Sequence, residues 1–157
     1  MFAGRRLSDL VSIIALIASI TLVLLCYNAL PNSMPMSFDS VGKAQAYGPK
    51  WSVWIPPVAA LFIYLLLGLS SRVPTKFLSL PIKITDENRS RVLPLIYEMN
   101  SSIRMLAEIT FFVLTLMVIR GATTGKSQLE LTILLYATEL AIVVTLVAYV
   151  IRMRRVA

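Results

Sequence analysis

The chain contains no histidine and only one cysteine among its 157 residues. Without histidine it lacks the commonest metal ligand and the side chain that most often transfers protons near neutral pH. The single cysteine, Cys26, lies inside an apolar run and cannot form a disulfide within the chain. No nucleophile stands near a base, and no glycine-rich phosphate loop occurs. We therefore expect no metal, no cofactor, no catalytic residues and no enzymatic activity.

Charge is also scarce. Charged residues make up 15% of the chain and hydrophobic residues 57%, whereas soluble domains carry about 25% charged residues. The formal net charge is +7, but the basic residues lie at the ends of apolar runs rather than along one surface. This distribution predicts an integral membrane protein and argues against a nucleic-acid partner.

Four apolar runs are long enough to cross a bilayer, which takes about 20 residues in a helix. The prediction is an all-α membrane protein, a four-transmembrane-helix bundle that forms a single domain over residues 1–157. The predicted spans are residues 8–29, 51–71, 102–119 and 129–151, joined by an outer loop at 30–50 and a connector at 72–100. Pro56 and Pro57 predict that the second span either kinks or begins there.

Lysine and arginine residues are more numerous on one side of the predicted spans. The positive-inside rule then places both termini and the connector in the cytoplasm, and the loop outside. We expect a multi-pass protein of the cytoplasmic (inner) membrane. In the connector, Thr85, Asp86 and Glu87 predict the start of an amphipathic helix, which meets Pro94 and either continues with a kink or stops. Ser8 and Asp9 are expected to cap the first span.

Two polar features lie inside the predicted spans. Arg104 and Glu108 are four residues apart on one helix face, which predicts an intramembrane ion pair near the cytoplasmic interface. Ser12, Ala15 and Ser19 form a face of small residues that allows close helix approach. We favour packing within the bundle over dimerisation for this face.

Glu139 lies near the middle of the fourth span with no opposite charge within one turn. Thr132, Tyr136 and Glu139 follow one stripe, and we expect this stripe to face the bundle because lipid would penalise it. The carboxyl group is interpreted as a proton acceptor, a cation site or a contact for an intramembrane partner. The alternative is a structural Glu139 that hydrogen-bonds to Tyr64, Thr110 or a carbonyl group.

The outer loop and the connector carry motifs that resemble a known family. The first comprises Pro31, the Met34–Phe38 segment, Gly42 and the Tyr47–Lys50 segment, and the second is the Pro81–Asn88 segment. In this order they resemble the small helical membrane domain at the front of Sdp-type immunity proteins. The chain departs from that family at Ser37, where the family usually carries histidine.

The resemblance implies a bacterial or archaeal inner-membrane protein. The best-known relatives protect the cell from a secreted membrane-active peptide and report its presence to a regulator. We therefore expect a peptide or protein partner that binds at the outer loop and the bundle interior. The candidate binding residues are Pro35, Ser37, Phe38, Asp39, Gly42, Lys50, Thr132, Tyr136 and Glu139. The alternatives are a small proton- or ion-coupled transporter that uses Glu139, an accessory subunit of a larger membrane complex, and a homo-oligomer.

Overall fold

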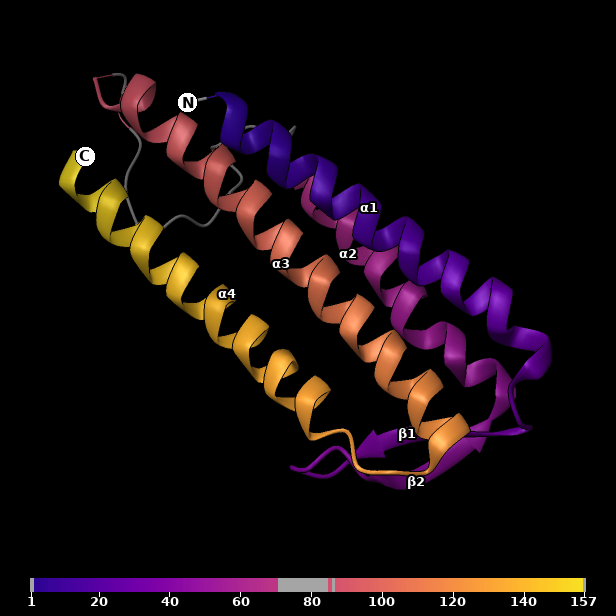
Figure 1. Ribbon diagram of the computed structural model, residues 1–157. Coiled ribbons are helices and arrows are strands. Elements are labelled where there is room, and N and C mark those ends of the chain that lie inside the picture. The colour runs from indigo at the N-terminus through magenta and orange to yellow at the C-terminus, as the bar shows by residue number, and fades with distance from the viewer. Residues whose placement is uncertain (1, 71–84, 86, 157) are drawn as a thin grey trace.

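The computed structural model describes residues 2–70, 85 and 87–156. Within these residues, four helices are long and apolar enough to cross a membrane. They are α1 (Phe2–Cys26), α2 (Ile55–Ser70), α3 (Arg89–Thr124) and α4 (Leu129–Val156). The start of α1 and the end of α4 lie at the same end of the molecule, as Figure 1 shows. The chain is thus a multi-pass membrane protein with the predicted all-α four-helix architecture.

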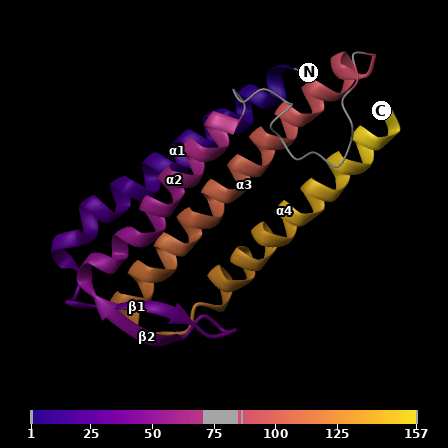
Figure 2. The same ribbon diagram turned by 180° about the vertical axis from the view of Figure 1, so that it is seen from behind.

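Helix α3 is the central element of the molecule. It packs against α1, α2 and α4, while within the described residues α4 packs mainly against α3. No residue from Val92 to Ile119 is exposed. The view from behind in Figure 2 also places α4 at the side of the other three helices. The fold is therefore a three-helix group with α4 attached to one of its members.

The small-residue face of α1 is buried, as we predicted for packing within the bundle. Ser12 and Ser19 are fully buried and Ala15 is nearly so. The Ser12 hydroxyl donates to the Ser8 carbonyl oxygen at 2.8 Å, and the Ser19 hydroxyl to that of Ala15 at 3.0 Å. Because the polar groups are satisfied within their own helix, this face can pack closely without leaving an unpaired donor.

The outer loop forms a two-stranded antiparallel hairpin, which the all-α prediction did not include. Strand β1 (Ser33–Phe38) pairs with β2 (Ala44–Pro49), with Ser33 opposite Pro49 and Phe38 opposite Ala44. Short 3₁₀ helices flank the hairpin, η1 (Tyr27–Ala29) before it and η2 (Lys50–Trp54) after it.

A polar turn closes this hairpin. The Asp39 carboxylate accepts hydrogen bonds from the backbone N–H groups of Val41 and Lys43, at 3.0 and 2.8 Å. Gly42 has a φ of 75°, which a glycine adopts without strain. An aspartate that bonds backbone two residues on, followed by a glycine with positive φ, is a typical hairpin turn.

The start of α1 differs from the prediction, and the start of α2 decides between the two predicted alternatives. Helix α1 begins at Phe2, so Asp9 lies inside the helix rather than at its amino end, and the predicted cap is wrong. In the second span, α2 begins at Ile55, and Pro56 and Pro57 occupy its first turn. Proline is tolerated there because the first N–H groups of a helix have no intrahelical partner.

Helix α3 is continuous through Pro94, so the helix that precedes this proline continues into the third span. Residues 72–84 and 86 of the predicted connector lie outside the described residues, as does most of the second motif. At the start of α3, the Thr85 N–H donates to the Asn88 side chain at 2.9 Å, and the Asn88 N–H to the Thr85 hydroxyl at 3.4 Å. This reciprocal pair resembles a capping box.

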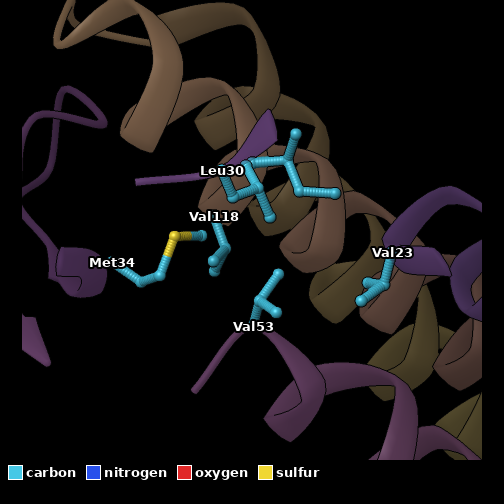
Figure 3. Close-up of a cluster of buried hydrophobic side chains, with 6 residues drawn as sticks. Val23, Leu30, Met34, Val53 and Val118 are labelled. Carbon is cyan, nitrogen blue, oxygen red and sulfur yellow. The ribbon is translucent and has the colours of Figure 1, made fainter. Parts of the chain in front are cut away.

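The helix ends nearest the hairpin share an apolar core with it. Val23, Met34 and Val53 are fully buried and belong to α1, β1 and η2. In Figure 3 the Met34 side chain extends towards Val118 of α3, with Leu30 beside them. The hairpin is therefore part of the folded core rather than a separate surface loop. At the opposite end, Val92, Leu95, Ile96 and Met153 join α3 to α4.

Candidate functional site

Strand β1 lies against the carboxyl end of α3, and Gly121 makes this contact possible. A Cβ atom at Gly121 would lie 3.0 Å from Phe38 Cε1 and 3.2 Å from Pro35 Cγ. Pro35 is buried and Phe38 is half-buried at this contact. Both side chains therefore hold the hairpin in place.

The hairpin turn lies on the amino end of α4. A Cβ atom at Gly42 would lie 2.5 Å from Thr132 Oγ1 and 2.8 Å from the Gln128 carbonyl oxygen. The Ser127 hydroxyl donates a hydrogen bond to the Val41 carbonyl oxygen. Two separate contacts, on α3 and on α4, thus fix the orientation of the hairpin relative to the helices.

The predicted loop residues are divided between structure and surface. Pro35, Phe38 and Gly42 pack the hairpin, and Asp39 shapes its turn. Ser37 is exposed, whereas the Lys50 ammonium group lies 5.0 Å from the centroid of the Tyr27 ring. Of the predicted loop residues, Ser37 alone has its side chain largely available for a partner.

Four larger side chains, which the sequence analysis did not select for binding, are exposed in the hairpin and in the adjoining η2. Met36 is 52% exposed, Val41 45%, Tyr47 55% and Trp51 60%. We call these four residues the outer apolar face. None of the residues of β2 is buried, and within the described residues this strand packs mainly on β1. The outer apolar face and the free edge of β2 are thus both accessible.

A polar cluster connects α1 to α3 towards the other end of the bundle. Arg104 forms a salt bridge with Asp9, and the Ser101 hydroxyl donates to the same Asp9 oxygen. The guanidinium group also lies 5.0 Å from the centroid of the Tyr64 ring on α2. Only 13% of the Arg104 side chain is exposed. One cation therefore joins three helices through an ion pair and a cation–π contact.

The predicted ion pair between Arg104 and Glu108 is wrong. Arg104 bonds to Asp9 instead, while Glu108 is fully buried and neither of its carboxyl oxygens has a hydrogen-bond partner. The i, i+4 spacing permits a pair on one helix. It gives no information about a competing acid on a neighbouring helix. Asp9 was not recognised as that acid because it was assigned to a helix cap.

A shallow cavity of about 290 Å³ adjoins this cluster between α2 and α3. Tyr64, Leu65, Gly68, Leu69 and Arg104 line it. A Cβ atom at Gly68 would lie 3.5 Å from Arg104 Nη1, which is an ordinary contact distance. The cavity therefore does not depend on a glycine at this position.

The predicted stripe on α4 does not face the bundle as a unit. Thr132 is buried, but Glu139 is exposed and Tyr136 is 55% exposed. At this level the inward residue is Thr138, whose hydroxyl lies 2.9 Å from the Thr110 hydroxyl of α3. Thr132 is buried because the hairpin turn covers it, not because it shares a face with Glu139. A charged carboxylate at the centre of a bilayer costs about 2.5–3.5 kcal/mol, so the exposed position of Glu139 requires an explanation.

The comparison with protein families matches residues 13–61 to a domain of unknown function, DUF1648. The matched segment contains most of α1, the whole hairpin and the first part of α2. The comparisons with curated proteins and with solved structures gave no match. The chain is thus similar over residues 13–61 to a domain without an assigned activity, and that segment includes the outer apolar face.

Proposed function

We propose that this protein is a non-enzymatic membrane receptor that binds a peptide or protein partner through the outer apolar face of its hairpin. The observation that carries the proposal is that Met36, Val41 and Tyr47 are exposed on a hairpin that is itself anchored in the helical core, with Trp51 exposed on the adjoining η2. Tyrosine and tryptophan are enriched where proteins bind partners, because they supply large contact areas at little entropic cost.

The anchoring supports binding because a fixed surface loses little conformational entropy when a partner docks. Met34 belongs to the apolar core that the hairpin shares with the helices, and the contacts at Gly42 and Gly121 hold the hairpin on α4 and α3. A loop whose function was only to connect two helices would not need these three attachments.

The free edge of β2 indicates the kind of partner. Among the described residues the sheet has two strands, so the outer edge of β2 has no neighbouring strand. An extended peptide can add to such an edge through backbone hydrogen bonds, and side-chain contacts then give specificity. Tyr47, in the middle of β2, would contact the added peptide.

The likeness to Sdp-type immunity proteins is consistent with this proposal. The peptide would be a secreted membrane-active molecule, the protein would lie in the cytoplasmic membrane of a prokaryotic cell, and the hairpin would face outwards. Binding would protect the cell or signal the presence of the peptide. Ser37, which is exposed, stands where the family usually carries histidine. The proposed binding therefore does not rely on a metal ion at this position.

Photo-crosslinking in cells that produce this protein tests the proposal. A photoreactive amino acid at Met36 or at Tyr47 is expected to give an adduct of one defined peptide or protein. Phe62, which is 64% exposed on α2 and lies seven residues after the first residue of that helix, is the matched control and should give lipid adducts only. With the recovered partner, Tyr47→Ala should weaken binding by about tenfold, as expected for an interface aromatic residue.

The proposal fails if Met36, Tyr47 and Phe62 give the same adducts. It also fails if Tyr47→Ala leaves the affinity for the recovered partner unchanged. Thermal unfolding of the variant in detergent shows whether its fold is intact, because Tyr47 is outside the buried core.

A second candidate function is proton or ion handling, and the buried Glu108 favours it. Its carboxyl group has no hydrogen-bond partner and lies one turn from Arg104. Ionisable groups inside membrane bundles commonly mark proton or ion pathways. In this version Glu108, rather than the exposed Glu139, would be the titrating group.

Proteoliposomes loaded with a pH-sensitive dye test this candidate. Glu108→Gln should abolish any proton flux that the native protein supports, while Glu139→Gln should leave the flux unchanged. Absence of flux in the native protein, or equal flux in Glu108→Gln, would exclude proton coupling through Glu108.

A further inference from the structure

Glu139 is an exposed carboxyl group near the middle of the apolar part of α4. It lies ten residues after the first residue of α4, Leu129, and one residue after Thr138, which bonds to the middle of α3. It has no hydrogen-bond partner within the described residues. A polar group in this position is stable only when another molecule supplies a partner, since lipid chains offer neither donors nor acceptors.

Tyr136 lies one turn before Glu139, and its side chain is 55% exposed. A phenol donates a hydrogen bond and a carboxyl group accepts one. The same part of α4 therefore presents one donor and one acceptor outwards. Leu140 and Val143, at 64% and 56% exposed, continue the surface around them. We call these four residues the α4 patch.

Few other exposed groups of this chain could pair with Glu139 inside the membrane. Over residues 10–26, 55–69, 102–119 and 131–150, the exposed polar side chains are Thr21, Tyr136 and Glu139. Two of the three therefore belong to the α4 patch itself. No exposed basic residue lies in these ranges, so a second copy cannot supply an ion pair for Glu139 at this depth.

Membrane symmetry restricts how two copies can meet. Copies inserted with the same orientation can be related by a two-fold axis only along the membrane normal. Two α4 helices around this axis run parallel, so equal residue numbers lie at equal depth. The α4 patch of one copy then meets the α4 patch of the other, as an isologous interface requires.

We propose that the protein forms a homodimer through the α4 patch, in which Tyr136 of each copy donates a hydrogen bond to Glu139 of the other. Symmetry makes two such bonds, and both exposed polar groups gain a partner. The polar complementarity of the patch with itself selects a second copy as the occupant. This proposal is independent of the receptor function, because the α4 patch and the outer apolar face do not share residues.

Disulfide crosslinking in membranes tests the contact directly. In a Cys26→Ser background, Leu140→Cys and Val143→Cys should give a dimer on oxidation. Leu66→Cys is the matched control, since Leu66 is 49% exposed in a span on a different helix. A dimer from Leu140→Cys but not from Leu66→Cys is the expected result. Equal crosslinking at both positions, or none at Leu140, overturns the proposal.

Association in liposomes, followed by energy transfer between labelled copies at increasing lipid dilution, tests the hydrogen bonds. Each substitution removes both symmetric bonds, and one interhelical hydrogen bond changes association by about threefold. Tyr136→Phe and Glu139→Leu should therefore each weaken the dimer by about eightfold, and Glu139→Gln, which keeps an acceptor, by less. Unchanged association in Glu139→Leu overturns the proposal. So does a crosslink from Leu140→Cys to a different protein in place of the second copy.

Discussion

Glu108 and Glu139 are the same residue type on neighbouring helices, and the bond between Thr110 and Thr138 shows that they lie at similar depth. Glu108 is fully buried on α3, whereas Glu139 is exposed on α4. The difference arises from the helices that carry them. Helix α3 has neighbours on several sides and α4 mainly one. Depth in the membrane therefore does not decide whether an acid is buried, because the number of neighbouring helices also matters.

The same contrast separates the two kinds of function. A buried carboxyl without a partner can act only inside the molecule, on a proton or an ion. An exposed carboxyl can act only on something outside, which in our proposal is a second copy. The outer apolar face at the hairpin is a third, separate surface, which shares no residue with the other two. Each can be tested without disturbing the others.

The largest effect is expected at the polar cluster that makes α3 central. Arg104→Ala leaves Asp9 without its cation and removes the contact with Tyr64. Removing one member of a largely buried ion pair costs about 3–5 kcal/mol. We expect a loss of about 4 kcal/mol in the free energy of unfolding, measured by SDS titration in mixed micelles.

The control for this variant lies on α4. Arg152 is exposed, and its guanidinium group lies 5.5 Å from the centroid of the Tyr149 ring. Arg152→Ala should cost less than about 1 kcal/mol, because exposed cation–π contacts contribute little. Equal losses from both arginines would contradict the central role of α3.

The next effect concerns the place where α4 does gain a second neighbour, the hairpin turn. Gly42→Ala forces a positive φ on a residue with a Cβ and places that atom against Thr132 and Gln128. Left-handed backbone costs about 1–2 kcal/mol and overpacking about 1–3, so we expect a loss of about 3 kcal/mol by the same titration.

Gly125→Ala separates the two causes of that loss. Gly125 has a φ of 61°, but no atom lies within 4 Å of a Cβ placed there. It should therefore show only the backbone cost, about 1 kcal/mol. If both variants lose the same stability, the hairpin turn does not pack against α4.

The third effect should be a gain. Glu108→Met replaces a buried carboxyl, whose oxygens have no partner, with an apolar side chain of similar length. An unsatisfied buried polar group costs about 1–3 kcal/mol. The free energy of unfolding of the variant should therefore be about 2 kcal/mol higher than that of the native protein. Glu139→Met, measured in micelles in which the protein is monomeric, should change the free energy of unfolding by less than about 0.5 kcal/mol. A loss of stability in Glu108→Met would show that a hydrogen-bonded water or ion satisfies this carboxyl.

The sequence was sufficient for the four helices, because long apolar runs have few alternatives in a chain with so little charge. The Ser12, Ala15 and Ser19 face also followed from its spacing. The hairpin turn was readable, since Asp39 and Gly42 carry a recognised pattern, but the prediction treated the segment only as an ordered loop.

Neither the partner of Arg104 nor the direction in which Glu139 points could be predicted from the sequence. Both depend on how helices are placed around α3, and an apolar helix shows no polar face from which its rotation can be derived. Arg104 and Glu108 do lie one turn apart on α3. Asp9 is distant from Arg104 in the sequence, yet it forms the salt bridge with Arg104 in the fold. Contacts between helices decide such pairs, and a single sequence does not contain them in a local pattern.

The smallest effect tests the contact between α3 and α4 itself. The Thr110 hydroxyl lies 2.9 Å from the Thr138 hydroxyl oxygen, to which it can donate its one proton in place of the Leu106 carbonyl oxygen of its own helix. The Thr138 hydroxyl accepts this bond and donates to the Leu135 carbonyl oxygen. Interhelical hydrogen bonds in membranes contribute about 0.6 kcal/mol on average. Thr138→Val should thus cost about that much, and the double variant with Thr110→Val should cost less than the sum of the two single changes. This coupling isolates the bond from the loss of each hydroxyl. Strict additivity in the double-mutant cycle would mean that the bond does not hold α4 to α3. The attachment of α4 would then rest on the apolar contacts around Met153 and on the hairpin turn at Gly42.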